Sequence, residues 1–143
     1  MTIEAVEELD ADIDRVWSYI GDFGGLRRWH PNVIACDVQV ANAGTQRVVQ
    51  LDGWHATERL GAYDPASYTL GYEMVDCGRP GLIGIRGLMR LEPLDANRCR
   101  IRWHSELPAG ASPELDGIMR AYYPERIGHL RDALLRDAGT NDA

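Results

Sequence analysis

The chain has 143 residues, of which 45% are hydrophobic and 26% charged, a size and composition typical of one soluble globular domain. Its formal net charge of -7 and the absence of a long basic run argue against a nucleic-acid partner. No apolar stretch approaches the ~20 residues of a membrane span, and the acidic N-terminal segment does not resemble a signal peptide. Three widely spaced cysteines favour reduced thiols. We therefore expect a single cytoplasmic domain over residues 1–143, with no metal site.

The first part of the chain predicts a strand, two short helices and a second strand. Residues 2–9 have the strand pattern, and Asp12 can cap a helix that carries an apolar face. The glycines at 21, 24 and 25 separate this helix from a shorter one at 26–29, which Pro31 ends. In the strand expected at 33–41, alternate residues should face inward. These residues are Ile34, Cys36, Val38 and Val40.

Residues 44–60 predict a β-hairpin, because Asp52-Gly53 is among the strongest two-residue turn signals. Counting outward from this turn puts Arg47 opposite Glu58, on a face that is otherwise apolar. A buried ion pair is a poor stabilising device, because desolvation offsets much of its attraction. The pair therefore indicates a ligand-binding or catalytic role beside a cavity, although a purely structural ion pair remains the alternative.

Three further strands are expected at 68–75, 83–91 and 99–107, each with one apolar and one polar face. The turn at 64–67 suggests a register in which Glu58 faces Tyr72, so that Arg47, Glu58 and Tyr72 would lie side by side on adjacent strands. Arginines gather on the polar face of the last strand, which predicts that this side of the sheet is fully exposed to water.

A long helix should follow, with Ser112 as its N-cap and Pro113 as its first residue. Its apolar residues recur at helical spacing, Pro124 predicts a kink, and residues 139–143 are expected to form a frayed tail. The apolar stripe comprises Leu115, Ile118, Met119, Tyr122, Ile127, Leu130 and Leu134. The predicted fold is thus α+β: about seven antiparallel strands curve around one long C-terminal helix and leave an internal cavity.

Beyond this pattern, several motifs resemble one known group. They are Val16-Trp17, residues 20–26, 29–31 and 58–60, Arg47, Asp52-Gly53, Asp64, Tyr72, Pro93 and Trp103. With the order of elements, they resemble the helix-grip fold of the START and birch-pollen-allergen (SRPBCC) superfamily, in its polyketide cyclase/dehydrase-like branch, which also contains plant lachrymatory factor synthase. The resemblance covers nearly the whole chain. It implies the fold more specifically than the function, since this superfamily hosts lyases, cyclases, receptors and lipid carriers.

The resemblance also implies roles for particular residues. In the lachrymatory factor synthase group, the positions of Arg47 and Glu58 form the catalytic pair. A tyrosine of that group is matched here by Ile85, which argues against the same sulfenic-acid reaction. Tyr72, or Tyr122 on the helix, would have to supply a hydroxyl group instead.

We expect Arg47, Glu58 and Tyr72 to be catalytic, and a further set of residues to line the ligand site. The connector that carries Phe23 to His30 is expected at the cavity mouth, with a gate role or plain packing as the two alternatives. The predicted ligand-binding residues are Phe23, Leu26, Trp29, His30, Cys36, Trp54, Met74, Ile85, Met89, Met119 and Tyr122.

The leading hypothesis is a cofactor-independent cyclase, dehydratase or isomerase that acts on a small hydrophobic or polyketide-like molecule. Glu58 would be the general acid/base, Arg47 would stabilise developing negative charge, and Tyr72 would donate a hydrogen bond. The main alternative is a non-catalytic carrier, in which Arg47 binds a carboxylate or phenolate and Glu58 only orients Arg47. A protein-protein adaptor does not need an inward ion pair and is the weaker third reading. Edge strands could also pair two chains into a homodimer.

Overall fold

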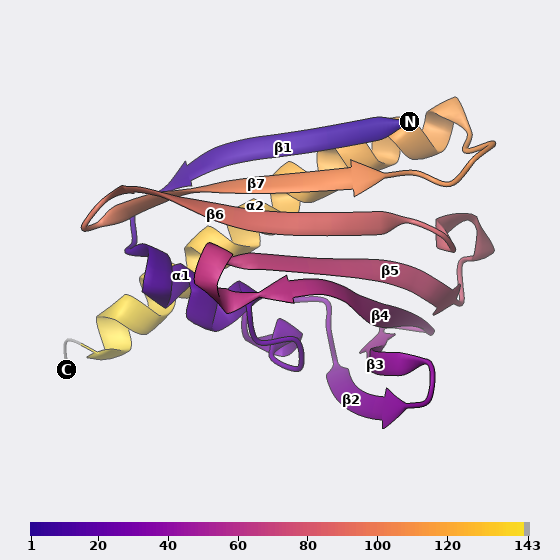
Figure 1. Cartoon of the computed structure of the whole chain (residues 1–143), viewed down its shortest axis with the longest axis horizontal. Helices are drawn as coiled ribbons and strands as arrows, with labels where there is room; N and C mark the ends of the chain where they lie inside the picture. Colours follow the sequence, from indigo (N-terminus) through magenta and orange to yellow (C-terminus); the bar gives the residue numbers. More distant parts are fainter. Residues whose placement is uncertain (142–143) are drawn as a thin grey trace.

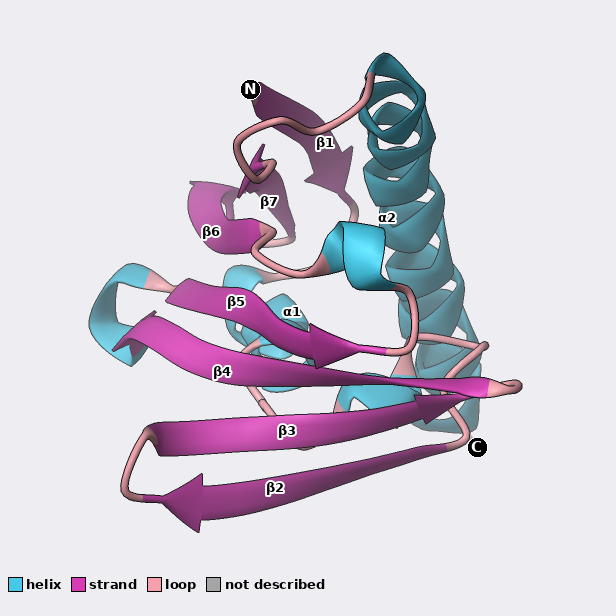
Figure 2. Ribbon diagram, turned by 90° about the vertical axis from the view of Figure 1, so that its right-hand side faces the viewer, coloured by secondary structure: helices cyan, strands magenta, loops and turns pink. Residues whose placement is uncertain are grey.

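The computed structural model describes the backbone of residues 1–141 and the side chains of residues 1–138. A seven-stranded antiparallel sheet curves around one long helix, α2 (Figures 1 and 2), in the strand order β1-β7-β6-β5-β4-β3-β2. The elements are β1 (Thr2–Leu9), α1 (Ile13–Ile20), η1 (Leu26–Arg28), β2 (Ala35–Ala41), β3 (Gly44–Leu51), β4 (Trp54–Asp64), η2 (Pro65–Ser67), β5 (Thr69–Cys77), η3 (Pro80–Leu82), β6 (Arg86–Asp95), β7 (Arg98–Glu106) and α2 (Pro113–Asn141). The predicted helix-grip architecture is confirmed. The second short helix is a single 3-10 turn, η1.

The local signals at the element ends act as the sequence predicts. The Asp12 carboxylate accepts a hydrogen bond from the Arg15 backbone N–H at 2.9 Å and so caps α1. The Ser112 hydroxyl accepts one from the Leu115 N–H at 3.1 Å at the start of α2. In the β3–β4 hairpin, Gly53 has a φ of 78°, and Arg47 pairs with Glu58 as predicted. The turn thereby fixes which side chains share the inner face.

The predicted register between β4 and β5 is wrong by two residues. Tyr72 lies opposite Leu60, and Glu58 lies opposite Met74. The main reason is that β4 continues to Asp64, which pairs with Thr69, so the turn is tighter than predicted. A one-residue irregularity beyond Leu60 offsets part of the difference. Because side chains alternate with a period of two, this shift keeps Tyr72 on the same face as Glu58.

The inward face predicted for the second strand is also wrong in part. Ile34 and Val38 are exposed, Val40 is 84% exposed, and Cys36 is only half-buried. The reason is the position of β2 at the edge of the sheet, at the end opposite β1, where Figure 2 shows it far from the N-terminal half of α2. Apolar alternation identified the strand correctly but not what covers it.

Helix α2 follows its predicted apolar stripe, with two differences. Tyr123 is fully buried, although the predicted stripe passes through Tyr122, and Ile118 is 62% exposed. The helix continues through Pro124 as one element to Asn141. Of the predicted tail, residues 139–141 are therefore helical, and residues 142–143 lie outside the described part of the chain.

Polar contacts join α2 to the inner face of the sheet. The hydroxyl groups of Tyr123 and Ser105 are 2.6 Å apart, and the rings of Tyr123 and Trp103 lie 5.0 Å apart. Trp103 in turn donates from Nε1 to the Tyr72 hydroxyl oxygen at 3.1 Å. The outer face is wet, as predicted, and carries ion pairs between strands, such as Arg102 with Glu92 and Glu4.

Two glycine-to-alanine changes should have opposite effects on stability. A Cβ at Gly87 would lie 2.2 Å from the Tyr72 ring, whereas nothing lies within 4 Å of one at Gly117, in the exposed first part of α2. We expect Gly87→Ala to lower the free energy of unfolding by about 1–3 kcal/mol through overpacking. Gly117→Ala should raise it by about 0.5–1 kcal/mol through helix propensity. Urea denaturation of both variants measures this; equal shifts in the same direction would contradict the position of Tyr72 over Gly87.

Candidate functional site

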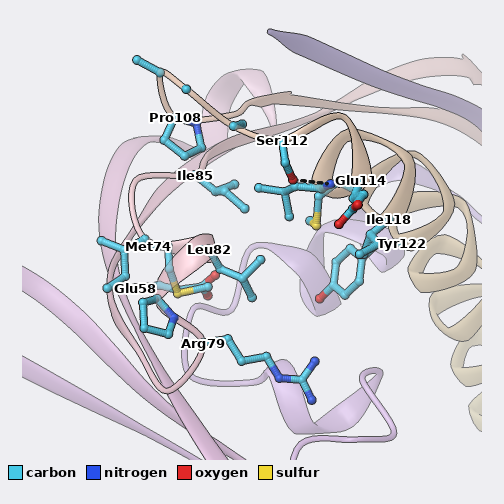
Figure 3. A pocket seen from close by; sticks show the side chains of 18 of the residues that line it. Glu58, Met74, Arg79, Leu82, Ile85, Pro108, Ser112, Glu114, Ile118 and Tyr122 are labelled. Atoms are coloured by element: carbon cyan, nitrogen blue, oxygen red, sulfur yellow. Dashed lines mark hydrogen bonds between the residues drawn. The ribbon is translucent and has the colours of Figure 1, made fainter.

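A pocket of about 770 Å³ lies between the inner face of the sheet and the first part of α2. Figure 3 shows Leu82 and Ile85 on one side of this main pocket, and Ile118 and Tyr122 of α2 on the other. Its outer part is formed by residues 79–83 around η3 and by residues 108–119. The lining is mostly apolar, which suits a hydrophobic molecule.

A smaller space of about 60 Å³, the deep chamber, adjoins the main pocket. The two spaces share lining residues, namely Trp54, Glu58, Tyr72, Met74 and Tyr122. The chamber adds residues from η1, β3, β6, β7 and α2. These include Leu26, Trp29, His30, Arg47, Met89, Trp103 and Arg126.

Arg47 and Glu58 form the central ion pair of the site. Nε and Nη2 of Arg47 both lie 2.7 Å from Oε1 of Glu58, and Nη1 donates to the Phe23 carbonyl oxygen at 3.1 Å. The guanidinium also lies over the Phe23 ring, 4.4 Å from its centroid. Arg47 is 4% exposed and Glu58 9%. The arginine is thus held on several sides, and it fixes the carboxylate of Glu58.

The second oxygen of Glu58 is free for other contacts. Among the described residues, no side chain or backbone group donates a hydrogen bond to Oε2, and Glu58 lines both the main pocket and the deep chamber. A carboxylate oxygen in this position can accept a hydrogen bond or a proton from a molecule in the pocket.

Tyr72 lies close to the pair. Its ring is 5.6 Å from the Arg47 guanidinium, and its hydroxyl oxygen accepts the Trp103 hydrogen bond. Burial raises the pKa of the Tyr72 phenol well above its ordinary value, so the hydroxyl group stays protonated. Its oxygen accepts from Trp103, and no described residue accepts its proton, so the hydroxyl group can still donate one hydrogen bond.

His30 is buried beside α2 and is neutral. Its Nδ1 accepts a hydrogen bond from the Asn32 backbone N–H at 3.3 Å, and its Nε2 lies 3.4 Å from the Tyr122 hydroxyl oxygen. Burial, followed by the positive charge of Arg126, lowers the pKa of His30 from 6.5 to about 3. A neutral ring can donate from Nε2 to Tyr122, but it is a very weak base.

All of the predicted site residues except Phe23 and Cys36 line the main pocket or the deep chamber. Phe23 packs beneath Arg47 and lines a separate surface pocket beside the end of α1. The Cys36 sulfur lies 4.0 Å from the Phe23 carbonyl oxygen, and burial raises the pKa of its thiol. Neither residue reaches the lining of the two spaces, and the roles of the others stay predictions.

The mouth of the main pocket is not where the sequence suggested. The connector of residues 23–30 buries its apolar side chains and exposes Arg27 and Arg28. Its residues Leu26, Trp29 and His30 line the deep chamber but not the main pocket, whose outer part is formed by lining residues from 79–83 and 108–119. Of the two alternatives for this connector, the burial of Phe23, Leu26 and Trp29 favours plain packing over a gate.

The sequence analysis missed a number of lining residues, among them residues 79–83 of the main pocket. In the deep chamber the missed residues that matter most chemically are Trp103 and Arg126. Trp103 is among the residues that carry the family resemblance but not in the predicted site. Arg126 interrupts the apolar stripe of α2 between Tyr122 and Ile127, a signal that was present in the sequence. Within the described residues, no group of three or more His, Cys, Asp or Glu side chains could hold a metal ion. No described helix is long and apolar enough to cross a membrane.

The buried His30 should make stability depend on pH. Its pKa is lower in the folded chain than the unfolded value of 6.5, so its contribution is complete above pH 6.5 and is lost as the pH falls toward 3. Between about pH 7.5 and about pH 5 this loss should be about 2 kcal/mol. Chemical denaturation at both pH values should show a loss smaller by this amount in His30→Gln; an equal loss in both proteins would mean that His30 is not the buried neutral group.

Comparisons with solved structures agree with this architecture. A search of curated proteins finds no match. Among solved structures, an uncharacterized protein from Bacillus thuringiensis has a TM-score of 0.81 at 19% identity, covering 94% of this chain and 99% of that one. A START superfamily protein from Mycobacterium smegmatis has a TM-score of 0.68 at 16% identity, covering 93% of each chain.

A di-domain aromatase/cyclase, BexL from the BE-7585A biosynthetic pathway, has a TM-score of 0.78 at 16% identity, covering 94% of this chain and 46% of that one. At such identities these likenesses show the fold alone. The family model described as "Polyketide cyclase / dehydrase and lipid transport" matches residues 1–134. The chain therefore belongs to the polyketide cyclase/dehydrase and lipid transport family.

Proposed function

We propose that this protein binds a small hydrophobic carbonyl compound in the main pocket and catalyses a cofactor-independent proton transfer on it. The reaction would be of the cyclase, dehydratase or isomerase kind. The observation that carries the proposal is the asymmetric use of the Glu58 carboxylate, whose Oε1 takes both hydrogen bonds from Arg47 while Oε2 is left to the pocket.

The arrangement favours Glu58 as the reacting group and Arg47 as its positioning residue. Each of the three guanidinium nitrogens of Arg47 already has a partner. Nε and Nη2 contact Glu58, and Nη1 contacts the Phe23 carbonyl oxygen. Rearranging them to bind a ligand carboxylate would break buried charge-assisted hydrogen bonds, which are among the strong ones. The converse role, in which Glu58 only orients Arg47 toward a ligand, is therefore less well supported.

Tyr72 supplies the second half of the chemistry. A carbon next to a carbonyl group loses its proton to Oε2 of Glu58, the electron pair moves to the carbonyl oxygen, and an enolate forms. The Tyr72 hydroxyl, protonated and free to donate, stabilises the developing oxyanion. Glu58 then returns the proton to a different carbon, which gives an isomer, or to a leaving hydroxyl group, which releases water.

A carrier of hydrophobic molecules is the second candidate, and the apolar mouth favours it. Ile118 is 62% exposed on α2, and Ile83, also partly exposed, lies across the mouth from it. Exposed apolar side chains around a pocket ease the passage of a hydrophobic ligand. The family description covers both enzymes and transport, so it does not choose between the two.

Exchange of carbon-bound protons tests the enzymatic proposal. The bicyclic ketone 2-tetralone has acidic protons beside its carbonyl group, and their replacement by deuterium in heavy water is followed by proton NMR. We expect the wild-type protein to accelerate exchange and Glu58→Gln to reduce the acceleration by ~100-fold or more, the usual contribution of a general base. Binding of 2-tetralone, followed by tryptophan fluorescence, should change little.

The matched control is Glu106→Gln, which removes an exposed carboxylate at the end of β7 and should leave exchange unchanged. Exchange that survives Glu58→Gln would rule out Glu58 as the base. Binding of 2-tetralone by the wild-type protein without any accelerated exchange would instead favour the carrier.

A further inference from the structure

We infer that Arg126 anchors a carboxylate group of the ligand in the deep chamber, so that the natural ligand is an amphipathic organic monoacid. The inference rests on the proposed function, because it assumes that the main pocket and the chamber hold a ligand. It adds the chemical class of that ligand and a binding residue on a different element from the Arg47–Glu58 pair.

The first observation is a buried guanidinium whose hydrogen-bonding capacity is only partly used. Arg126 is 5% exposed and lines the chamber. Its Nε is buried and has no hydrogen-bond partner among the described residues, and none of their carboxylates lies within ion-pair distance of it. Nη1 donates a hydrogen bond to His129 Nδ1 at 3.0 Å, and the guanidinium also makes a polar contact with the Tyr122 hydroxyl. Neither partner is charged.

Such an arrangement is costly unless something else compensates for it. An arginine cannot lose its charge in a protein, and a buried charge without a partner costs several kcal/mol. The Tyr122 ring, whose centroid is 4.4 Å from the guanidinium carbon, gives a cation–π contact that compensates in part. An anion bound in the chamber would complete the compensation.

The second observation is the charge of the chamber lining. Arg47 is matched by Glu58, whereas Arg126 has no counterpart, and the neighbouring His30 is neutral. The charged side chains of the lining therefore sum to one positive charge. A carboxylate, with one negative charge, balances it, whereas a phosphate monoester, with nearly two, would not.

The size and the other polar groups of the chamber fit the same ligand. Its volume of about 60 Å³ exceeds the roughly 10–15 Å³ that one water molecule requires, so it can hold a carboxylate but not the body of a larger molecule. The Tyr122 hydroxyl also borders both spaces and can donate to the second carboxylate oxygen while it accepts from His30. The apolar body would then extend into the main pocket, past Glu58 and Tyr72.

A matched pair of ligands isolates the charge. Naphthalene-2-carboxylate and naphthalene-2-carboxamide have the same apolar body and nearly the same shape, and only the first is an anion. By isothermal titration calorimetry we expect the wild-type protein to bind the carboxylate at least about tenfold more tightly than the amide. Arg126→Met should bind both about equally, with the affinity for the amide nearly unchanged.

The control variant is Arg120→Met, which removes an exposed arginine from the same helix and should keep the preference for the carboxylate. Arg126→Gln serves if Arg126→Met does not fold. Denaturation gives a second measurement: the unliganded Arg126→Met protein should be at least as stable as the wild type, because an uncompensated charge has been removed.

The outcomes separate this inference from the proposed function. A preference for the carboxylate that persists in the Arg126 variants would overturn the inference and leave the ligand site in place. Binding of the amide without any preference for the carboxylate in the wild type would do the same. Failure of the wild type to bind either compound would count against the ligand site itself, and the inference would fall with it.

Discussion

One helix has to cover the inner face of seven strands, and the rest of the structure follows from this mismatch. Strands lie about 4.8 Å apart, so seven of them would span about 29 Å if flat, whereas a helix with its side chains is about 10–12 Å wide. Curvature brings the sheet toward α2, and α1 and η1 fill part of the remaining inner face. Part of the inner face is still not covered. On one side of α2 this part forms a wall of the main pocket, and at the sheet edge it leaves apolar residues of β2 exposed.

The polar groups of the inner face are arranged around this uncovered space. Tyr72, Trp103, Tyr123 and Ser105 are linked by hydrogen bonds and ring contacts that run from β5 through β7 to α2. This network fixes the wall of the pocket, since each hydroxyl oxygen in it has a partner within the fold, although the Tyr72 proton has no acceptor among the described residues. Glu58 and Arg126 differ, because each keeps a polar atom that no described residue satisfies. Among the described residues, Asp116 Oδ1 in the first part of α2 is also buried without a partner. Unsatisfied polar atoms that border a pocket indicate where a ligand would supply the missing partner.

Much of the fold could be predicted from local signals, and the errors share one cause. The Asp52-Gly53 turn determined the Arg47–Glu58 pair, because a two-residue hairpin leaves no freedom of register. The next register failed because β4 continues to Asp64, which pairs with Thr69, and one-residue irregularities then change the pairing along β4; nothing local in the sequence reports either feature. The predictions for β2 and for the pocket mouth were also wrong because local signals do not determine these features. They depend on where α2 lies relative to the sheet, and periodicity along one element does not contain that information.

The candidate site was likewise predictable where it depends on the hairpin and less so where it depends on the helix. Helical spacing gave a stripe on α2, and Arg126 lies on its buried side, one residue before Ile127. Burying a charged residue at such a position costs free energy when the helix packs against a core, so this cost was predictable from the sequence alone. The compensation was not, because it requires the distances to Tyr122 and His129 and the absence of an acidic partner among the described residues. A reactive carboxylate on the sheet and a positive charge on the helix together define two ends of one ligand, which neither element could indicate alone.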